Sequence, residues 1–330
     1  MSALLNRRPA PEKVVAFAVA VAPAAWLVGL AYQGELGVRP VTEAIRISGD
    51  WALRLFWLVL LVSPARRILA APRLFRTRRI LGLGAFGLTA LHFGLYALDQ
   101  QFDWIEVGLE VLLRTYLTFG AAAMIGLAVL AASSSDRAVS RLGGARWNRL
   151  HQGVYAIAAL SLVHFLLRSR TNTFEPMLMF GLFAWLMGYR LTHRFAGDVT
   201  PARLLGLAVA AAALTATAET CWHAAATGVD ARRILAAHLD ITHGLRPAWW
   251  VLAAGVAAAA PSLTWDRGRL ARYRGAAAGA ASPVVGTAAG ETPGVPGQGG
   301  GQARVPPQRP ISRMSASQAV AGSTRGQSAS

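Results

Sequence analysis

Seven histidines are the side chains of this 330-residue sequence best suited to redox or metal chemistry. Two of them, His92 and His164, lie well inside apolar stretches, where an ionisable residue is costly and usually functional. Counted at ~1.5 Å per helical residue, both lie about 18 to 20 Å from the same edge of their stretches. Two imidazoles at one level on facing helices can supply both axial nitrogens of a haem iron. The sequence therefore predicts a haem site at His92 and His164; the simpler alternative is a pair of structural hydrogen bonds.

A third histidine, His151, lies at the edge of the stretch that holds His164. The two are 13 residues apart, which on a straight helix separates them by about 20 Å along the axis and about 140° around it. His151 therefore faces a different neighbour or sits on an irregular helix. Its position suits a second haem, a flavin or a quinone headgroup, and a simple interfacial histidine is an equally good interpretation. The flanking residues that support a cofactor contact are Arg146, Trp147 and Arg149.

The other four histidines carry weaker signals. His193 lies among arginines and is expected at a membrane interface. The remaining three, in or beside the loop 221–247, have no acidic partner at the spacing of a metal-binding helix, so surface positions are expected. They are His223, His238 and His243.

The single cysteine, Cys221, restricts the possible redox centres. One cysteine cannot form an intramolecular disulfide, a Cys-based zinc site, a Cys-ligated iron–sulfur cluster or a Cys-x-x-Cys-His haem attachment. A haem in this chain is therefore expected to be b-type and held without a covalent link.

The stretches that carry these histidines are apolar enough to cross a membrane. Apolar residues make up 54% of the chain and charged residues 15%, with a mean hydropathy of +0.39, whereas soluble domains average about 25% charged residues. A helix needs roughly 20 mostly apolar residues to span a bilayer. The weakest of eight predicted spans are 51–64, 177–191 and 248–263. The full set is 14–31, 51–64, 80–98, 115–132, 151–167, 177–191, 204–220 and 248–263.

Arginine placement predicts the orientation of these spans. With the N-terminus inside, the inside segments up to Arg274 hold 20 basic residues and the outside loops hold 8. The segment Ala65–Arg79 alone contains six arginines and no acid. Because short cytoplasmic loops carry the excess of Lys and Arg, we predict a multi-pass membrane protein with both termini cytoplasmic. The high Arg and Ala content with a single Lys suggests a bacterial source, so the expected location is a bacterial inner membrane.

Arginines at the span ends could also hold a cofactor. A guanidinium binds a haem propionate or a flavin phosphate through two parallel hydrogen bonds. Arg114 and Arg168 are the candidates at the outer end. For Arg78, Arg79 and Arg149 at the inner end, membrane topology is the favoured explanation.

The predicted organisation is an all-α membrane helical bundle in four parts. These are a cytoplasmic N-terminus (1–13), a haem-binding transmembrane core (14–195), an additional membrane hairpin (196–265) and a cytoplasmic low-complexity tail (266–330). From about Gly275 the tail is rich in Gly, Ala, Pro, Ser and Gln, a composition typical of disorder. No Gly-x-Gly-x-x-Gly motif follows a strand, so electrons must come from a separate donor. The expected partners are the lipid bilayer and other proteins, with no nucleic acid.

Three motifs carry a family resemblance. Arg76–Leu83 leading to His92, Arg114–Gly120, and Arg141–His151 running on to His164 occur in order at characteristic separations. In these motifs the chain resembles the haem-binding membrane subunits of the periplasmic methionine-sulfoxide reductase system (MsrQ). That family belongs to the ferric-reductase-like transmembrane superfamily. The resemblance covers about residues 15–195 and implies a six-helix ferric-reductase-like core, to which this chain adds two probable spans.

The resemblance implies a function and a site. His92, His151 and His164 fall on the family's haem-ligand positions, with His92 and His164 as ligands of the iron. Haem b is the implied cofactor, with flavin mononucleotide (FMN) as a further candidate. Electrons would enter on the cytoplasmic side from quinol or a flavin reductase and leave to a periplasmic molybdopterin-type reductase that repairs oxidised methionine. The chain would then be an oxidoreductase subunit, with substrate reduction on its partner.

Two departures limit this interpretation, and two alternatives accompany it. Family members end near the equivalent of Arg194, so the added spans allow a different partner. The sequence also contains nothing that selects a methionine-sulfoxide reductase over another periplasmic acceptor. Within the redox class, a ferric or other metal reductase is the nearest alternative. Outside it, a transporter or scaffold could use the deep histidines to carry protons. Such relays commonly pair His with intramembrane acids, and the only acid near a span core is Glu219, which weakens that alternative.

Overall fold

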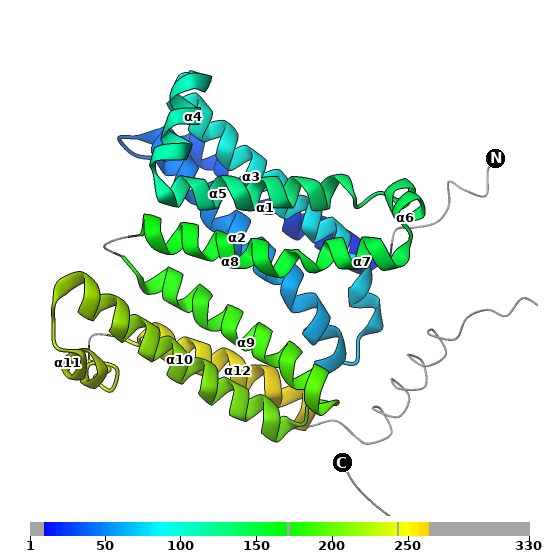
Figure 1. Ribbon diagram of the computed structural model, residues 1–330, viewed down its shortest axis with the longest axis vertical. Coiled ribbons are helices and arrows are strands. Elements are labelled where there is room, and N and C mark those ends of the chain that lie inside the picture. The colour runs from blue at the N-terminus through cyan, green and yellow to red at the C-terminus, as the bar shows by residue number, and fades with distance from the viewer. Residues whose placement is uncertain (1–9, 170–171, 243, 264–330) are drawn as a thin grey trace, which may run out of the picture. The chain divides into compact units, whose positions relative to one another are not determined.

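The computed structural model describes residues 10–169, 172–242 and 244–263, which all belong to one compact unit. These residues form helices joined by loops, with no strand among them (Figure 1), so the prediction of an all-α bundle is confirmed. The predicted low-complexity tail, 266–330, lies outside the described residues. The elements are α1 (Pro11–Gln33), α2 (Pro40–Ile68), η1 (Pro72–Thr77), α3 (Arg78–Asp99), α4 (Trp104–Leu113), α5 (Thr115–Ala132), α6 (Asp136–Leu142), α7 (Gly144–Gln152), α8 (Val154–Arg168), α9 (Phe174–Ala196), α10 (Pro201–Thr227), α11 (Ala231–Ala236) and α12 (Pro247–Leu263).

Local sequence signals set where the long helices begin and end. Proline occupies the first turn of α1, α2 and α10, where its missing N–H costs nothing. Gly34 and Gly228 follow α1 and α10 with φ of 70°, a left-handed conformation that glycine adopts without strain. Asp103 caps α4 by accepting hydrogen bonds from the backbone N–H groups of Ile105 and Glu106. These signals keep the helix ends at two levels of the bundle.

Five stretches of the described chain are long and apolar enough to cross a membrane. Three further helices coincide with the predicted spans that were weakest in the sequence. Of these, α12 has only 17 residues, while α2 and α9 are long enough, with 29 and 23 residues, but carry more charge. The five stretches are Pro11–Gln33, Pro72–Asp99, Thr115–Ala132, Gly144–Arg168 and Pro201–Thr227.

The helix α2 is much longer than the predicted span 51–64. Charged residues near its start made the apolar stretch look short, but these charges are paired. Arg46 pairs with Glu43 and Asp50 on the same helix, and Arg54 pairs with Glu175 of α9. Paired charges are tolerated inside a membrane bundle where isolated ones are not, so the helix continues through the charged segment.

The outside of the bundle is strongly apolar. Phe17, Val28, Ile125 and Val209, on three of the five apolar stretches, each expose more than half of their surface. Contiguous apolar surface of this kind marks an interaction or membrane surface. It therefore fits a bundle whose solvent is lipid.

The helix α2 occupies the middle of the bundle (Figure 1). It packs on α1, α3 and η1 and also on α9 and α12, while α5 packs on α8 and on α3. The Trp57 indole donates to the Met179 carbonyl at 3.0 Å and thereby ties α2 to α9. We call the side where α3 and α8 end the α4 end, and the opposite side the α7 end. The helices α2, α3, α5 and α8 together enclose the site described next.

Candidate functional site

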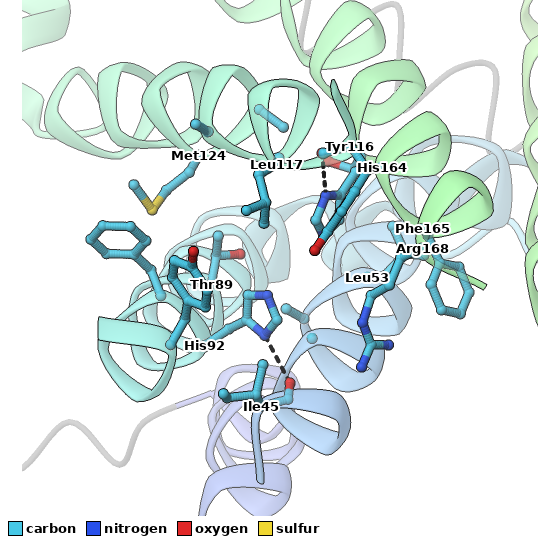
Figure 2. A pocket seen from close by; sticks show the side chains of 18 of the residues that line it. Ile45, Leu53, Thr89, His92, Tyr116, Leu117, Met124, His164, Phe165 and Arg168 are labelled. Carbon is cyan, nitrogen blue, oxygen red and sulfur yellow. Dashed lines mark hydrogen bonds between the residues drawn. The ribbon is translucent and has the colours of Figure 1, made fainter. Parts of the chain in front are cut away.

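His92 of α3 and His164 of α8 face each other across a cavity at the α4 end (Figure 2). Their ring centroids are 6.4 Å apart, and the ring planes are inclined at 81°. The cavity is walled by residues of α2, α3, α5 and α8. The two histidines, which the sequence places at the same depth, therefore lie close together and line the same cavity.

Each imidazole is held by one backbone carbonyl of a neighbouring helix. His92 Nδ1 donates to the Ile45 carbonyl of α2 at 2.8 Å, and His164 Nδ1 donates to the Tyr116 carbonyl of α5 at 2.7 Å. Because a carbonyl only accepts, each Nδ1 must carry the proton, which leaves the Nε2 lone pair available. Metal-ligating histidines are usually fixed in this way through the other ring nitrogen. The structural hydrogen bonds considered as the simpler alternative are therefore present, and they also prepare both rings to bind a metal.

Two glycines make room for these rings. Gly49 lies four residues after Ile45, and Gly120 lies four residues after Tyr116, so each stands beside the carbonyl that accepts the histidine hydrogen bond. A Cβ at Gly49 would lie 2.9 Å from His92 Nδ1, and one at Gly120 would lie 2.7 Å from His164 Nδ1. Sequence reasoning missed both residues. A glycine inside a helix is a sign of such a position only when the helix packs against one that carries a histidine. Which helices pack together is decided by the tertiary structure.

The cavity is lined mostly by apolar side chains, as cofactor sites commonly are. It opens to solvent, and the space between the helices amounts to about 1180 Å³ when that open region is included. The 6.4 Å between the ring centroids leaves room for one metal ion between the two imidazoles, whose nitrogens bind metals at about 2.0–2.1 Å. The apolar walls include Leu53, Phe56, Phe93, Leu117, Met124, Leu127 and Phe165.

Charged residues line the cavity as well. Arg168 follows His164 by one helical turn, lines the cavity and makes no hydrogen bond or ion pair among the described residues. Arg46 also lines it, while it pairs with Glu43 and Asp50. Sequence reasoning proposed Arg168 but missed Arg46, which had entered only the topology argument.

The other outer candidate, Arg114, is not among the residues that line the cavity. It pairs with Glu110 on α4. The same carboxylate accepts a hydrogen bond from the Tyr96 hydroxyl at 2.6 Å, and Tyr96 lines the cavity. Arg114 therefore lies behind the cavity wall, next to the lining residues Tyr96 and Tyr116.

The structure places His151 away from the pair. It lies at the α7 end, on α7, and the helix breaks at Gly153 before α8 begins. Its ring stacks on Trp147 with centroids 3.9 Å apart, and its Nδ1 contacts the Trp147 carbonyl at 3.2 Å. Its Nε2 is buried and has no hydrogen-bond partner in the part of the chain that the structure describes. His151 does not share the cavity of His92 and His164.

A second polar cluster lies in the C-terminal helices, and it shows that the expectation for His238 was wrong. His238, expected at the surface, is only 6% exposed and lies beside Glu219, which is 4% exposed. The Glu219 carboxylate contacts His238 Nε2 at 3.2 Å and accepts from Arg246 at 2.9 Å. His238 Nδ1 also contacts the Ile234 carbonyl at 3.0 Å. Glu219 therefore joins α10 to α11 and to the start of α12, and neither deep histidine is among its partners.

This cluster leads to a stability prediction. Replacing Glu219 by leucine should lower the free energy of unfolding by about 1–3 kcal/mol, because it leaves the buried His238 and the partly exposed Arg246 without the carboxylate that they contact. Glu219→Gln should be milder, since the amide can still accept from Arg246 and donate to His238. Thermal unfolding followed by tryptophan fluorescence measures both changes. The exposed control Glu35→Leu should stay within about 0.5 kcal/mol of wild type, and an equally small effect of Glu219→Leu would contradict the prediction.

Comparisons with known proteins agree with this geometry. The model of the family described as "Ferric reductase like transmembrane component" matches residues 48–162. That range contains His92 and His151, the two glycines that face the histidine rings and most of the cavity wall. No solved structure is a match for the chain.

Several curated relatives cover most of their own length. One from Caulobacter vibrioides is 40% identical over 171 residues, which is 52% of this chain and 81% of the relative. Another from Polaromonas naphthalenivorans is 36% identical over 57% of this chain and 87% of the relative. A third from Rhodospirillum rubrum is 34% identical over 57% and 91%. All three are named "Protein-methionine-sulfoxide reductase heme-binding subunit MsrQ". The chain belongs to the MsrQ family.

Membership in the MsrQ family confirms the resemblance stated from the motifs. Each of these MsrQ relatives is matched over most of its length, yet more than two fifths of this chain lies outside each match. This chain is therefore an MsrQ-family protein with a substantial additional part.

Proposed function

We propose that this MsrQ-family chain is a b-type haem-binding, electron-conducting subunit of a bacterial inner membrane. Its electrons would come from a cytoplasmic-side donor, quinol or a flavin reductase, and pass to a periplasmic methionine-sulfoxide reductase of the molybdopterin type. One observation carries the proposal: two imidazoles, each fixed through Nδ1 by a backbone carbonyl, lie 6.4 Å apart in one cavity. The names of the MsrQ relatives support both the haem and the reductase partner.

The chain's own residues would position and protect the cofactor. His92 and His164 would hold haem through their Nε2 atoms, and haem when bound supplies a one-electron redox centre. The carbonyls of Ile45 in α2 and Tyr116 in α5 bind Nδ1 of the two rings, so the opposite nitrogen, Nε2, points away from α2 and α5. The apolar walls exclude water, which affects the reduction potential through burial. The Arg168 guanidinium, which makes no hydrogen bond or ion pair with any described residue, could bind a propionate bidentately.

The orientation follows from the distribution of arginine. We place the α7 end on the cytoplasmic side together with both termini, because basic residues are concentrated there. On this orientation His151 lies near the electron donor and the His92–His164 cavity lies near the acceptor. Trp147 and His151 offer a stacked aromatic surface for FMN or a quinone headgroup, and the neighbouring Arg149 could pair with the phosphate of FMN.

The decisive experiment is the reduced-minus-oxidised absorption spectrum of the detergent-purified protein. We expect a low-spin b-type spectrum, because two neutral nitrogen ligands favour that state. A protein that stays colourless after haem supplementation would contradict the proposal and favour a transporter or scaffold. The reduced protein should then be mixed separately with a methionine-sulfoxide reductase and with a ferric chelate. Faster oxidation by the chelate would favour the ferric-reductase alternative.

Replacing His151 tests whether the two ends of the bundle are separate. In His151→Ala the low-spin spectrum of the His92–His164 pair should persist, because His151 does not line their cavity. Haem content per protein and the rate of reduction by a flavin reductase are the measurements. A halved haem content would indicate a second haem at the α7 end, and an unchanged content with slower reduction would indicate a donor contact. Complete loss of the spectrum would contradict the separation.

A further inference from the structure

Three arginines from three helices gather at the α7 end. Arg66 of α2 and Arg78 of α3 both lie over the ring of Phe75, with guanidinium carbons 5.1 and 5.8 Å from its centroid. Arg78 is also within electrostatic range of Arg190 of α9 and of Tyr155 of α8. All three arginines are half-buried. We call Arg66, Arg78 and Arg190 the arginine cluster.

The arginine cluster has no negative partner among the described residues. Arg190 donates only to neutral groups, which are the Leu60 and Leu186 carbonyls and the Tyr155 hydroxyl. Among the described residues, Arg78 makes no hydrogen bond, and the Nε of Arg66 is buried without a hydrogen-bond partner.

Two acids of this end are paired with arginines outside the cluster. Glu12 pairs with Arg76, and Asp136 pairs with Arg79. No ion pair joins the arginine cluster to a carboxylate among the described residues, so the cluster concentrates positive charge.

Such an arrangement is costly unless an anion completes it. A buried donor without a partner loses its hydration and gains no compensating bond. Like charges held together in a medium less polar than water also repel one another more strongly. Planar guanidiniums that converge from several directions match the oxygens of a phosphate group.

We propose that the arginine cluster binds the phosphate of an anionic phospholipid headgroup. Basic pockets between membrane helices on the cytoplasmic side are known sites for such headgroups. The surroundings favour a lipid over a soluble phosphate compound, because exposed apolar side chains lie in the same helices and loop as the cluster. These are Leu69 after α2, Phe75 of η1 and Leu191 of α9, and they offer acyl chains a surface next to the bound phosphate.

This site is separate from the His92–His164 cavity. None of the three arginines lines the His92–His164 cavity, and a bound lipid here would hold α2, α3 and α9 together at the α7 end. Tryptophan fluorescence can follow stability whether or not haem is bound. A failed lipid test therefore leaves the electron-transfer proposal untouched, and the reverse also holds.

The test compares the delipidated full-length protein with two variants and a matched control. Arg66→Gln and Arg78→Gln each remove one guanidinium from the cluster. Arg73→Gln removes the same charge at the same end, from an exposed arginine of η1 that has no ion pair among the described residues. Each protein is titrated with phosphatidylglycerol in phosphatidylcholine vesicles, and separately with inorganic phosphate, while the unfolding temperature is recorded. Native mass spectrometry then counts the lipids retained after purification.

We expect phosphatidylglycerol to raise the unfolding temperature of wild type and Arg73→Gln, and to bind either cluster variant about tenfold more weakly, as for one lost charge-assisted hydrogen bond. If Arg78→Gln fails to fold, Arg66→Gln and Arg78→Lys provide the comparison, since lysine keeps the charge without the planar fork. Equal binding by all variants would overturn the site. Stabilisation by inorganic phosphate without any retained phosphatidylglycerol would overturn the lipid assignment and favour a soluble phosphate compound such as FMN.

Discussion

Replacing His92 or His164 by alanine is expected to abolish the low-spin haem spectrum. Each substitution removes one of the two Nε2 atoms that face the shared cavity, and the remaining imidazole cannot provide two axial ligands. Loss of a residue that only supports a metal ligand already weakens metal binding about 10–100-fold, so loss of a ligand should reduce haem retention by at least about 100-fold. The measurements are haem content per protein and the reduced-minus-oxidised spectrum.

The matched control for these variants is His223→Ala. His223 is also a histidine near the end of a long apolar helix, but it contacts the Thr173 hydroxyl at 3.0 Å and does not line the haem cavity. Its haem spectrum should equal that of wild type. A wild-type spectrum in either His92→Ala or His164→Ala would show that the haem, if present, is bound elsewhere.

The second large effect is expected from the two glycines that contact the histidine rings. In Gly49→Ala and Gly120→Ala the new methyl group would lie within 3.0 Å of His92 or His164, so the ring must move. Movement lengthens or breaks the hydrogen bond to the carbonyl of Ile45 or Tyr116. Because this bond fixes the ligand, we expect haem to be retained about tenfold less well, with a high-spin component in the spectrum.

The helix α5 offers a control that separates this effect from ordinary overpacking. A Cβ at Gly126 would lie 2.7 Å from the Ile157 side chain and touch no histidine. Gly126→Ala should therefore lower the free energy of unfolding by about 1–3 kcal/mol, as overpacking does, and leave the spectrum unchanged. If Gly120→Ala and Gly126→Ala gave the same spectrum and the same loss of stability, Gly120 would have only a packing role.

The two ends of the bundle differ in how their charges are satisfied. At the α4 end, Arg46 and Arg54 have carboxylate partners, and Arg168 is left available beside the cavity. At the α7 end, the arginine cluster makes no ion pair with any described residue, and Arg190 donates to neutral groups. This difference supports one cofactor site near the first end and an anion site at the second.

Much of the candidate site could be predicted from composition and spacing. The length of the apolar stretches predicted a membrane bundle, since hydrocarbon thickness alone determines how many residues a helix needs to cross it. Constant rise per residue placed His92 and His164 at one depth, because depth along a helix depends only on residue number. The absence of a second cysteine excluded a Cys-x-x-Cys-His haem attachment, since counting cysteines needs only the sequence.

Other features depend on which helix faces which, and spacing within one helix carries no information about that. The carbonyls of Ile45 and Tyr116 and the glycines that follow them act on histidines 47 and 48 residues away. The helix α2 is longer than predicted because its charged residues are paired with each other and with Glu175. A count of apolar residues treats those charged residues as the end of the span. Likewise, His238 is buried only because α10 brings Glu219 to it.

The sequence by itself thus determined the class of protein, the level of the paired histidines and the asymmetry of charge between the two ends. These properties depend only on how many residues of each kind a segment contains and on where they lie along one helix. Only the tertiary structure decided which nitrogen of each histidine is left free, which arginines lack a counter-charge and which histidine stands apart. Those outcomes depend on contacts between helices far apart in the chain, where a few tenths of an ångström separate a hydrogen bond from a clash.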